Sequence, residues 1–204
     1  MPNLGLMKDN YRWMAPVYSS LSRWVFGRQL EEAKTCFLSN IPNKTILILG
    51  GGDGKDYSKY RQRLQGDFVE KSASMLHLAK RNLQGAALNF ILGEPAPAKK
   101  YDAILLPFVL DTFSDQELDA FFEGLGGKLK AGGKVYLSDF HQTDSAWQKA
   151  GMTFIIRVFR LVTGHVRKDL PDYSSYFDRA GFQLVLEKSW QKGWIKAQIW
   201  EQIT

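Results

Sequence analysis

The stretch that decides the fold of this chain is TILILGGGDG, residues 45–54. Its first half, Thr45–Leu49, is a β-branched and leucine run without a polar break, which is typical of a strand buried on both faces. Its second half carries Gly50, Gly52 and Gly54, where the chain must turn sharply and let a ligand approach the backbone. The combination predicts a cofactor site at the carboxyl end of the first strand of an open α/β sheet.

The spacing of these glycines indicates which cofactor binds. The dinucleotide-binding pattern Gly-x-Gly-x-x-Gly, counted from Gly50, needs a third glycine where this chain has Lys55. Counted from Gly52, the missing glycine falls at Tyr57. The tighter spacing resembles motif I of class I S-adenosylmethionine-dependent methyltransferases, in which the glycine turn lies under the methionyl part of the cofactor. A strand-to-helix turn without a ligand is the alternative for this motif alone. The resemblance implies these cofactor contacts: Gly50, Gly51, Gly52, Asp53 and Gly54.

An acid at the end of the second predicted strand strengthens the resemblance. The strand Asp67–Glu70 ends in Glu70, 20 residues after Gly50, where a carboxylate could accept hydrogen bonds from two ribose hydroxyls. The segment that follows resembles the family's acid-x-Ser-x-x-Met-Leu-x-x-Ala stretch, which implies that Lys71 and Met75 also lie at the cofactor. Ser72 is the predicted N-cap of the helix that begins here. The alternative for Glu70 is a solvated loop acid.

Three later segments continue the resemblance, which runs from about residue 45 to residue 140. Leu88–Leu92 is the predicted third strand, and Gly93 and Glu94 follow it where the family usually has Gly-Asp near the adenine. Glu94 could equally be a solvated turn residue. Residues 101–106 resemble the fourth strand, and residues 128–140 resemble the helix, Gly-Gly turn and fifth strand that follow.

The resemblance implies an α/β fold. The expected architecture is a Rossmann-like, seven-stranded, mostly parallel sheet of order 3-2-1-4-5-7-6, with the last strand antiparallel and helices on both faces. Periodicity predicts helices over 9–19, 21–38, 144–163 and 173–180, and a hairpin of 182–190 and 194–202 joined by 191–193. We expect a single domain made of an N-terminal helical lid (1–42), a cofactor-binding core (43–140) and substrate-side helices with the hairpin (141–204).

Composition limits the class of protein. The chain has 204 residues of which 45% are hydrophobic, enough for one well-cored domain. Its apolar runs are too short for a membrane-spanning helix, and its first residues do not form a signal peptide. The single cysteine, Cys36, excludes an internal disulfide and favours a reducing compartment, so we expect a cytoplasmic protein. Three scattered histidines without metal-ligand spacing predict no metal site.

The catalytic candidates follow the fourth and fifth strands. Methyl transfer is an in-line attack on a sulfonium methyl group, so the enzyme mainly aligns the nucleophile and excludes water. In quinone-biosynthesis C-methyltransferases and their small-molecule relatives, a polar residue is common where this chain has Pro107, and a histidine where it has Asp111. The resemblance implies that Pro107 lies at the cofactor. Asp111 could contact the substrate, but we favour a cap on the helix that begins near Ser114. His141 is the best-placed proton acceptor, with an exposed loop histidine as the alternative.

The N-terminal segment Tyr11–Tyr18 resembles the Tyr/Phe-x-x-x-Ala-x-x-Tyr opening of the same relatives. There this segment covers the cofactor as a lid, which implies that Tyr11 contacts the cofactor and Tyr18 the reacting groups. Ordinary aromatic packing of a terminal helix is the alternative. An apolar, aromatic-rich pocket for a small, partly apolar acceptor is expected from these residues: Trp13, Trp24, Phe26, Phe108, Phe113 and Phe140.

Residues 147–168 form an unusual segment with five basic residues, no acid and apolar residues around most of its circumference. Such a helix is buried in the fold, lies at a homodimer interface, or rests on an anionic membrane surface. Burial is the default, and peripheral membrane contact would suit a lipophilic acceptor. The net charge of +6 is modest and scattered, so nucleic acid is not indicated as a partner.

Two other functions are compatible with parts of the pattern. Residues 50–54 also resemble the Gly-Gly-Gly-Asp-Gly of polyamine synthases, but those enzymes need acids after the fourth strand, where this chain has Leu105–Pro107. A non-catalytic binding protein of the same fold is the second alternative, because Ile48 stands where motif I usually has an acid that orders the turn. The predicted function is therefore S-adenosylmethionine-dependent methyl transfer to a small acceptor.

Overall fold

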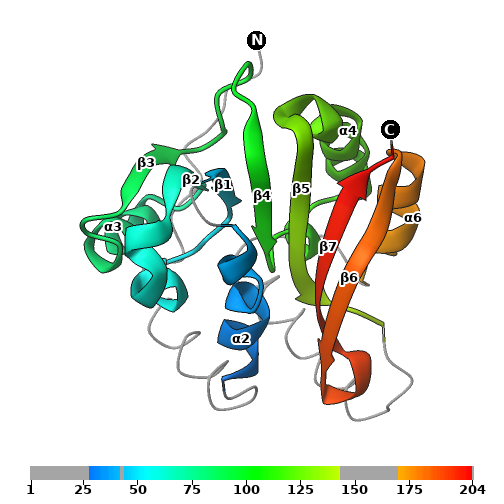
Figure 1. The fold of residues 1–204 in the computed structure, drawn as a ribbon, viewed down its shortest axis with the longest axis horizontal. Helices are drawn as coiled ribbons and strands as arrows, with labels where there is room; N and C mark the ends of the chain where they lie inside the picture. The colour runs from blue at the N-terminus through cyan, green and yellow to red at the C-terminus, as the bar shows by residue number, and fades with distance from the viewer. Residues whose placement is uncertain (1–27, 42–43, 143–169, 204) are drawn as a thin grey trace.

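A computed structural model describes residues 28–41, 44–142 and 170–203 (Figure 1). They form one seven-stranded sheet of order β3-β2-β1-β4-β5-β7-β6. The neighbouring pairs among β1 to β5 are parallel, whereas β7 runs antiparallel to both β5 and β6. The Rossmann-like order expected from the sequence is thus confirmed. The strands are β1 (Thr45–Leu49), β2 (Gln65–Glu70), β3 (Ala87–Leu92), β4 (Tyr101–Pro107), β5 (Leu129–Phe140), β6 (Phe182–Trp190) and β7 (Ile195–Gln202).

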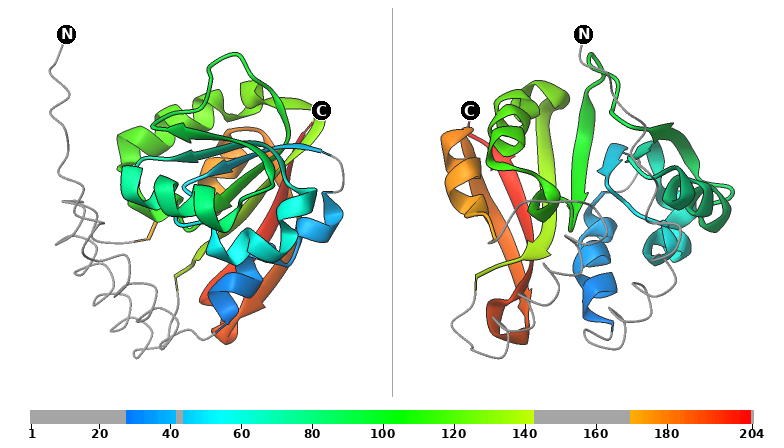
Figure 2. Two further views of the ribbon diagram at one scale, coloured as in Figure 1. Left: turned by 90° about the vertical axis from the view of Figure 1, so that its left-hand side faces the viewer. Right: turned by 180° about the vertical axis from the view of Figure 1, so that it is seen from behind.

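Helices cover both faces of the sheet, as Figures 1 and 2 show. Side chains of α2, η2 and α3 pack into the hydrophobic cluster on one face, and side chains of η3, α4 and α6 pack into the cluster on the other. The α-helices are α2 (Gln29–Thr35), α3 (Ala73–Asn82), α4 (Asp115–Leu125) and α6 (Tyr173–Arg179). The 3₁₀ helices are η1 (Leu38–Asn40), η2 (Lys55–Arg63), η3 (Leu110–Thr112), η4 (Gly126–Lys128) and η5 (Gln191–Gly193).

The apolar run of β1 explains why this strand lies at the centre of the sheet. Ile46 and Ile48 enter the cluster under α2, η2 and α3, while Leu47 enters the cluster under α4 and α6. All three side chains are at most 2% exposed. A strand with both faces buried needs apolar residues at successive positions, so the prediction from residues 45–49 is confirmed.

The helix starts confirm one predicted cap and correct another. Ser72 caps α3, because its hydroxyl accepts a hydrogen bond from the Met75 backbone N–H at 3.3 Å. At α4 the cap is Ser114, which forms a reciprocal capping box with Glu117. The prediction that Asp111 caps this helix is therefore wrong. Asp111 lies one short element earlier, in η3, because the chain makes a 3₁₀ turn before α4 begins.

The C-terminal hairpin agrees closely with the prediction: β6 and β7 are joined by η5. Of the predicted first helices, only residues 28–38 are described; they form α2 and the start of η1. The predicted helices over 9–19 and 144–163 lie outside the described residues. Within the described ranges no helix is long and apolar enough to cross a membrane.

Candidate cofactor and acceptor site

The glycine turn after β1 is tightly packed except at its middle. Gly50, Gly52 and Gly54 all have positive φ angles, of 70°, 63° and 68°. A side chain at Gly50 would collide with Val109 after β4, and one at Gly51 would collide with Phe68 of β2. A Cβ at Gly52, by contrast, would have no described atom within 4 Å. Val109 and Phe68 thus pack closely against the first part of the turn, whereas the backbone at Gly52 stays open to a ligand.

Glu70 is fastened to this turn. At the end of β2, its Oε2 accepts a hydrogen bond from the Gly52 N–H at 3.0 Å, and its Oε1 accepts one from the Ser72 N–H at 2.9 Å. Each carboxylate oxygen has two lone pairs and can accept more than one hydrogen bond. A nucleoside ribose offers two hydrogen-bond donors. The open backbone at Gly52 and the acid beside it therefore fit the cofactor predicted from the sequence.

Hydrogen bonds also close the glycine turn and tie it to α3. Asp53 closes its own turn, because its Oδ1 accepts from the Lys55 N–H at 3.1 Å. Its carbonyl accepts from Asn82 Nδ2 at 2.9 Å, which ties the turn to the far end of α3. Met75 is half-buried in the first turn of α3. Asn82 was not predicted as a site residue, since nothing in the local pattern shows that α3 folds back to the turn.

The loops after β2, β3 and β4 converge on the same edge. The Gly93 N–H donates to the carbonyl of Glu70 at 3.0 Å, so Gly93 lies beside the acid, whereas the Glu94 side chain is exposed. Lys71 Nζ lies 5.4 Å from the centroid of the Phe113 ring, which brings the loop after β2 to the loop after β4. Such convergence at the carboxyl ends of parallel strands is where open α/β sheets bind ligands.

A strained residue follows β4. Pro107 ends the strand in register with Ser138, and Phe108 has φ = 52°, a left-handed conformation that bulky side chains rarely adopt. The Phe108 N–H donates to the carbonyl of Ser138 at 2.7 Å. Strain of this kind is concentrated at functional sites, where the surrounding structure must hold it.

The strained turn places the Phe108 ring in a row of aromatic side chains. The centroids of Phe108 and Phe140 are 5.0 Å apart, and those of Phe140 and Trp194 are 5.6 Å apart. Lys34 Nζ of α2 lies 5.6 Å from the Phe108 centroid. We call Phe108, Phe140 and Trp194 the aromatic row. Two of its members were predicted as pocket residues. Trp194 was missed, because it reaches this edge only through the antiparallel return of β7.

The remaining predicted pocket residues divide into two groups. Phe113 does not join the aromatic row but packs edge-on against Phe121, with centroids 5.7 Å apart. Trp13, Trp24 and Phe26 lie outside the described residues. Tyr11 and Tyr18 also lie outside them, as does the basic segment 147–168.

Asp111 has an acidic neighbour on the face covered by α4 and α6. Asp139, near the end of β5, is 0% exposed, and its Oδ1 accepts from the Phe140 N–H at 2.8 Å. Burial raises the pKa of Asp139 well above its usual range, and the negative charge of Asp111 raises it further. Both effects favour the protonated form of Asp139. The motif comparison gave Asp139 no role, since its burial depends on α6.

His141 is a weaker base than expected. Its ring packs edge-on against Tyr173 with centroids 5.3 Å apart, and its backbone N–H donates to the carbonyl of Trp194 at 2.8 Å. Burial, with the charge of Lys196, lowers the pKa of His141 to about 4. The imidazole is thus neutral near pH 7 and partly buried. Neither the expected neutral-range pKa nor the exposed loop histidine agrees with this position.

Comparisons with known proteins agree with this geometry. Residues 22–187 match the family model described as a methyltransferase domain. No curated protein shows significant similarity to the chain. Among solved structures, the DhpI complex with S-adenosylhomocysteine gives a TM-score of 0.68 at 15% identity, covering 98% of this chain and 99% of that one.

Two further structures are longer than this chain. Mitomycin 7-O-methyltransferase MmcR gives a TM-score of 0.65 at 16% identity, and TnmH gives 0.64 at 16% identity. The alignments cover 93% and 94% of this chain but 60% of each of those chains. At these identities the structural likeness shows the fold alone. The family model covers well over half of the sequence, and on that basis the chain belongs to the methyltransferase-domain family, as its resemblance to class I S-adenosylmethionine-dependent methyltransferases implies.

Proposed function

We propose that this methyltransferase binds S-adenosylmethionine between the glycine turn and Glu70 and transfers its methyl group to a small, partly apolar acceptor. The observation that carries the proposal is the pair of hydrogen bonds that joins Glu70 to Gly52 and Ser72. Glu70 would accept from the ribose hydroxyls, and the open backbone at Gly52 would lie against the methionyl part. The bound cofactor supplies an electrophilic methyl group on a sulfonium centre. Other residues assigned to this site are Gly50, Gly51, Asp53, Gly54, Lys71, Met75 and Gly93.

The acceptor would lie against the aromatic row. Rings that meet at the carboxyl ends of β4 and β5 favour an apolar or aromatic acceptor and help to exclude water during transfer. Pro107 offers no side-chain hydrogen bond at the end of β4, so alignment would rest on shape. If the acceptor carries a proton that must leave, Asp111 is the proposed proton acceptor, because it is only half-buried and lies on the loop after β4.

Titration calorimetry with S-adenosylmethionine and S-adenosylhomocysteine tests the cofactor site. We expect the wild type to bind both, and Glu70→Gln to weaken binding at least about tenfold, because the amide replaces one acceptor oxygen with a donor. Glu123→Gln on the exposed surface of α4 is the matched control and should bind as the wild type does. Absence of binding by the wild type would refute the proposed cofactor.

The non-catalytic alternative is based on the missing acid of motif I. Ile48, where motif I usually has an acid, is 0% exposed and packs in the core. The Gly52 N–H is bonded to Glu70, so the turn has an acid partner from another strand. A transfer assay with labelled methyl donor and a panel of lipophilic and phenolic acceptors separates the two functions. Methyl transfer to any of them supports the enzyme, and binding without transfer across the panel supports the alternative.

Two observations argue against the polyamine-synthase alternative. Membership of the methyltransferase-domain family opposes it, and β4 ends in Leu105, Leu106 and Pro107, which are buried and apolar. No acid stands at these positions to hold a polycationic acceptor.

The predictions about partners and location remain proposals. The cytoplasmic location, the homodimer and the membrane contact through residues 147–168 rest on sequence alone. Co-sedimentation with anionic liposomes at low salt tests the membrane contact, and binding that disappears at high salt is the expected result. Failure to sediment at low salt would remove it.

A further inference from the structure

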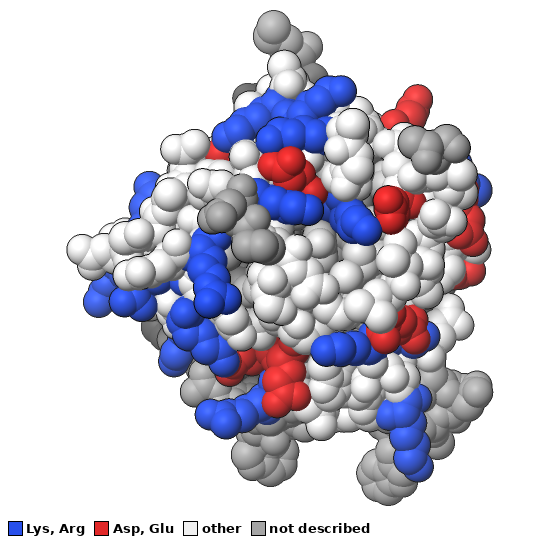
Figure 3. All heavy atoms as spheres, in the orientation of Figure 1, with Lys and Arg blue, Asp and Glu red and all other residues white. Residues whose placement is uncertain are grey.

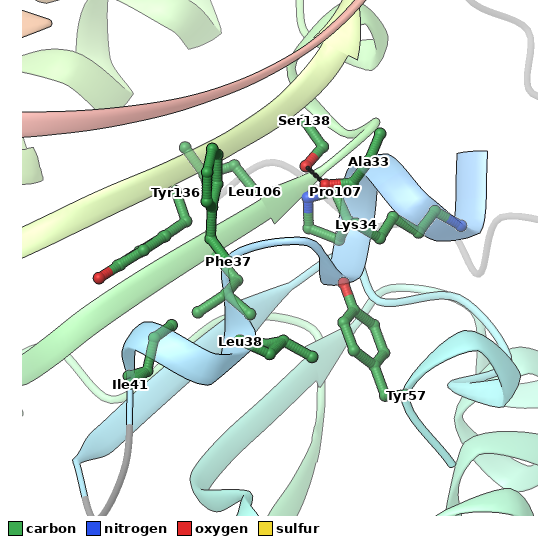
Figure 4. A pocket seen from close by; sticks show the side chains of 11 residues that line it. Ala33, Lys34, Phe37, Leu38, Ile41, Tyr57, Leu106, Pro107, Tyr136 and Ser138 are labelled. Atoms are coloured by element: carbon green, nitrogen blue, oxygen red, sulfur yellow. Dashed lines mark hydrogen bonds between the residues drawn. The ribbon is translucent and has the colours of Figure 1, made fainter. Parts of the chain in front are cut away.

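A small cavity lies between α2 and the carboxyl ends of β4 and β5 (Figure 4). Its volume is about 10 Å³. Most of its wall is apolar, and the polar side chains that reach it come from different elements: Lys34 of α2, Tyr57 of η2 and Ser138 of β5. A volume of this size holds about one water molecule and no larger ligand.

The Tyr57 hydroxyl needs a partner in this cavity. The side chain is 1% exposed, and its hydroxyl has no hydrogen-bond partner among the described residues. In Figure 4 it points from η2 toward α2 and Pro107. Burial raises the pKa of Tyr57, so the phenol stays protonated and can donate. A buried hydroxyl without a partner destabilises a fold, and such groups are therefore bonded, often to ordered water.

Ser138 supplies the second partner. Its hydroxyl is buried and donates to the carbonyl of Ala33 at 2.9 Å, so the lone pairs of Oγ remain available to accept. Tyr57 and Ser138 thus offer one donor and one acceptor to the same water-sized space. An internal water needs two to four polar partners, and this wall provides at least two.

We propose that this cavity holds one ordered water, which accepts a hydrogen bond from Tyr57 and donates one to Ser138. The water joins η2 to the end of β5 beneath α2. Because the Tyr57 N–H donates to the carbonyl of Gly54 at 3.1 Å, the bridge also connects the glycine turn to the strand that carries Phe140. It stands beside direct links between α2 and η2, such as the Lys34–Asp56 ion pair at 2.8 Å. The inference does not depend on the proposed function.

The sign of a change in melting temperature tests the bridge. Tyr57→Phe removes only the hydroxyl, so it should lower the melting temperature by about 3 °C if that hydroxyl is bonded to water. It should raise the melting temperature if the hydroxyl has no partner, and that result would overturn the proposal. Tyr136→Phe is the matched control, because Tyr136 lines the same cavity but its hydroxyl points away from it (Figure 4). We expect less than about 1 °C for this control.

Two further measurements address the water itself. In a double-mutant cycle, Tyr57→Phe and Ser138→Ala should lower the melting temperature together by less than the sum of the single shifts, because each alone breaks the same bridge. Additive shifts would contradict a shared water. A high-resolution crystal structure of the wild type should show one density peak within hydrogen-bonding distance of Tyr57 Oη, absent in Tyr57→Phe. A dry cavity, or a protein atom bonded to Tyr57, would overturn the inference.

Discussion

Two buried aspartates lie in the same sheet, toward opposite ends of its strands, and have opposite surroundings. Asp67 of β2 is 1% exposed and accepts hydrogen bonds from Lys99 at 2.7 Å, Asn89 at 3.0 Å and Tyr101 at 2.6 Å. Asp139 near the end of β5 is 0% exposed and faces a second acid, Asp111.

The pKa values of Asp67 and Asp139 are shifted in opposite directions. Burial alone would raise the pKa of Asp67, but the hydrogen bonds from Lys99, Tyr101 and Asn89 together outweigh it and lower the pKa. Burial raises the pKa of Asp139, and Asp111 raises it further. In Figure 3, Lys and Arg side chains gather at the top of the molecule, near the start of β4. The amino-terminal region of the sheet thus stabilises the fold, while the carboxyl edge keeps groups in the perturbed states that are common at functional sites.

The largest expected effect comes from removing the paired acid. Asp67→Ala leaves the buried Tyr101 hydroxyl and the Lys99 ammonium without their acceptor, and should lower the free energy of unfolding by about 3 kcal/mol. Urea denaturation measures it, with Glu123→Ala on the exposed surface of α4 as control. A loss below about 1 kcal/mol would show that the cluster is not worth more than a surface contact.

At the carboxyl edge of the sheet, a substitution in the glycine turn should affect cofactor binding more than stability. Gly52→Ala places a methyl group in the open space beside the backbone and should lower the affinity for S-adenosylmethionine at least about tenfold. Gly85→Ala is the control, since Gly85 also has a positive φ, of 87°, and no described atom within 4 Å of its Cβ position. Both variants should lose about 1 kcal/mol of stability, because alanine resists this conformation. Equal affinities of the two variants would place the ligand elsewhere.

The two aspartates should also give opposite pH dependences. The contribution of Asp67, whose pKa is lowered, is present above about pH 4 and is lost as the pH falls through its folded pKa. The contribution of Asp139, whose pKa is raised, is present below about pH 4 and is lost as the pH rises through its folded pKa.

Substitution by asparagine separates these contributions. The stability of Asp139→Asn relative to the wild type should increase as the pH rises from 5 to 7, because the amide has no proton to lose. Asp67→Asn should show the reverse trend below pH 4, with its deficit shrinking as the pH falls. Urea denaturation at pH values below 4 and between 5 and 7 measures the stabilities of both variants. If the stabilities of the two variants depended on pH in the same way, the proposed contrast between Asp67 and Asp139 would be wrong.

The smallest expected effect concerns His141. Because its pKa is lowered to about 4, its ring should stay neutral from pH 8 down to about pH 5, with no transition near the ordinary value of 6.5. Chemical shifts of the imidazole in a pH titration measure this directly. A midpoint near 6.5 would mean that the ring is more solvated than its packing on Tyr173 implies.

Local sequence patterns predicted most of the fold and the glycine turn that we propose to hold the cofactor. The run in β1, the glycines after it and the Ser72 cap each depend on neighbours within a few residues, so each could be recognised along the chain. Glu70 could be placed because parallel strands end at one edge. The errors at Asp111 and His141 share a cause. Whether a polar side chain caps a helix, faces solvent or is buried depends on segments far away in the chain.

The sequence by itself determined the fold class, the order of the strands through the family resemblance, and the position of the glycine turn after β1. Only the tertiary structure decided that Glu70 bonds to Gly52, that Trp194 joins Phe108 and Phe140, and that Asp139 is buried beside Asp111. The physical reason is the range of the interactions. Backbone conformation and hydrophobic periodicity are local, whereas burial, pairing of charges and pKa values are set by groups that meet only after the sheet has formed.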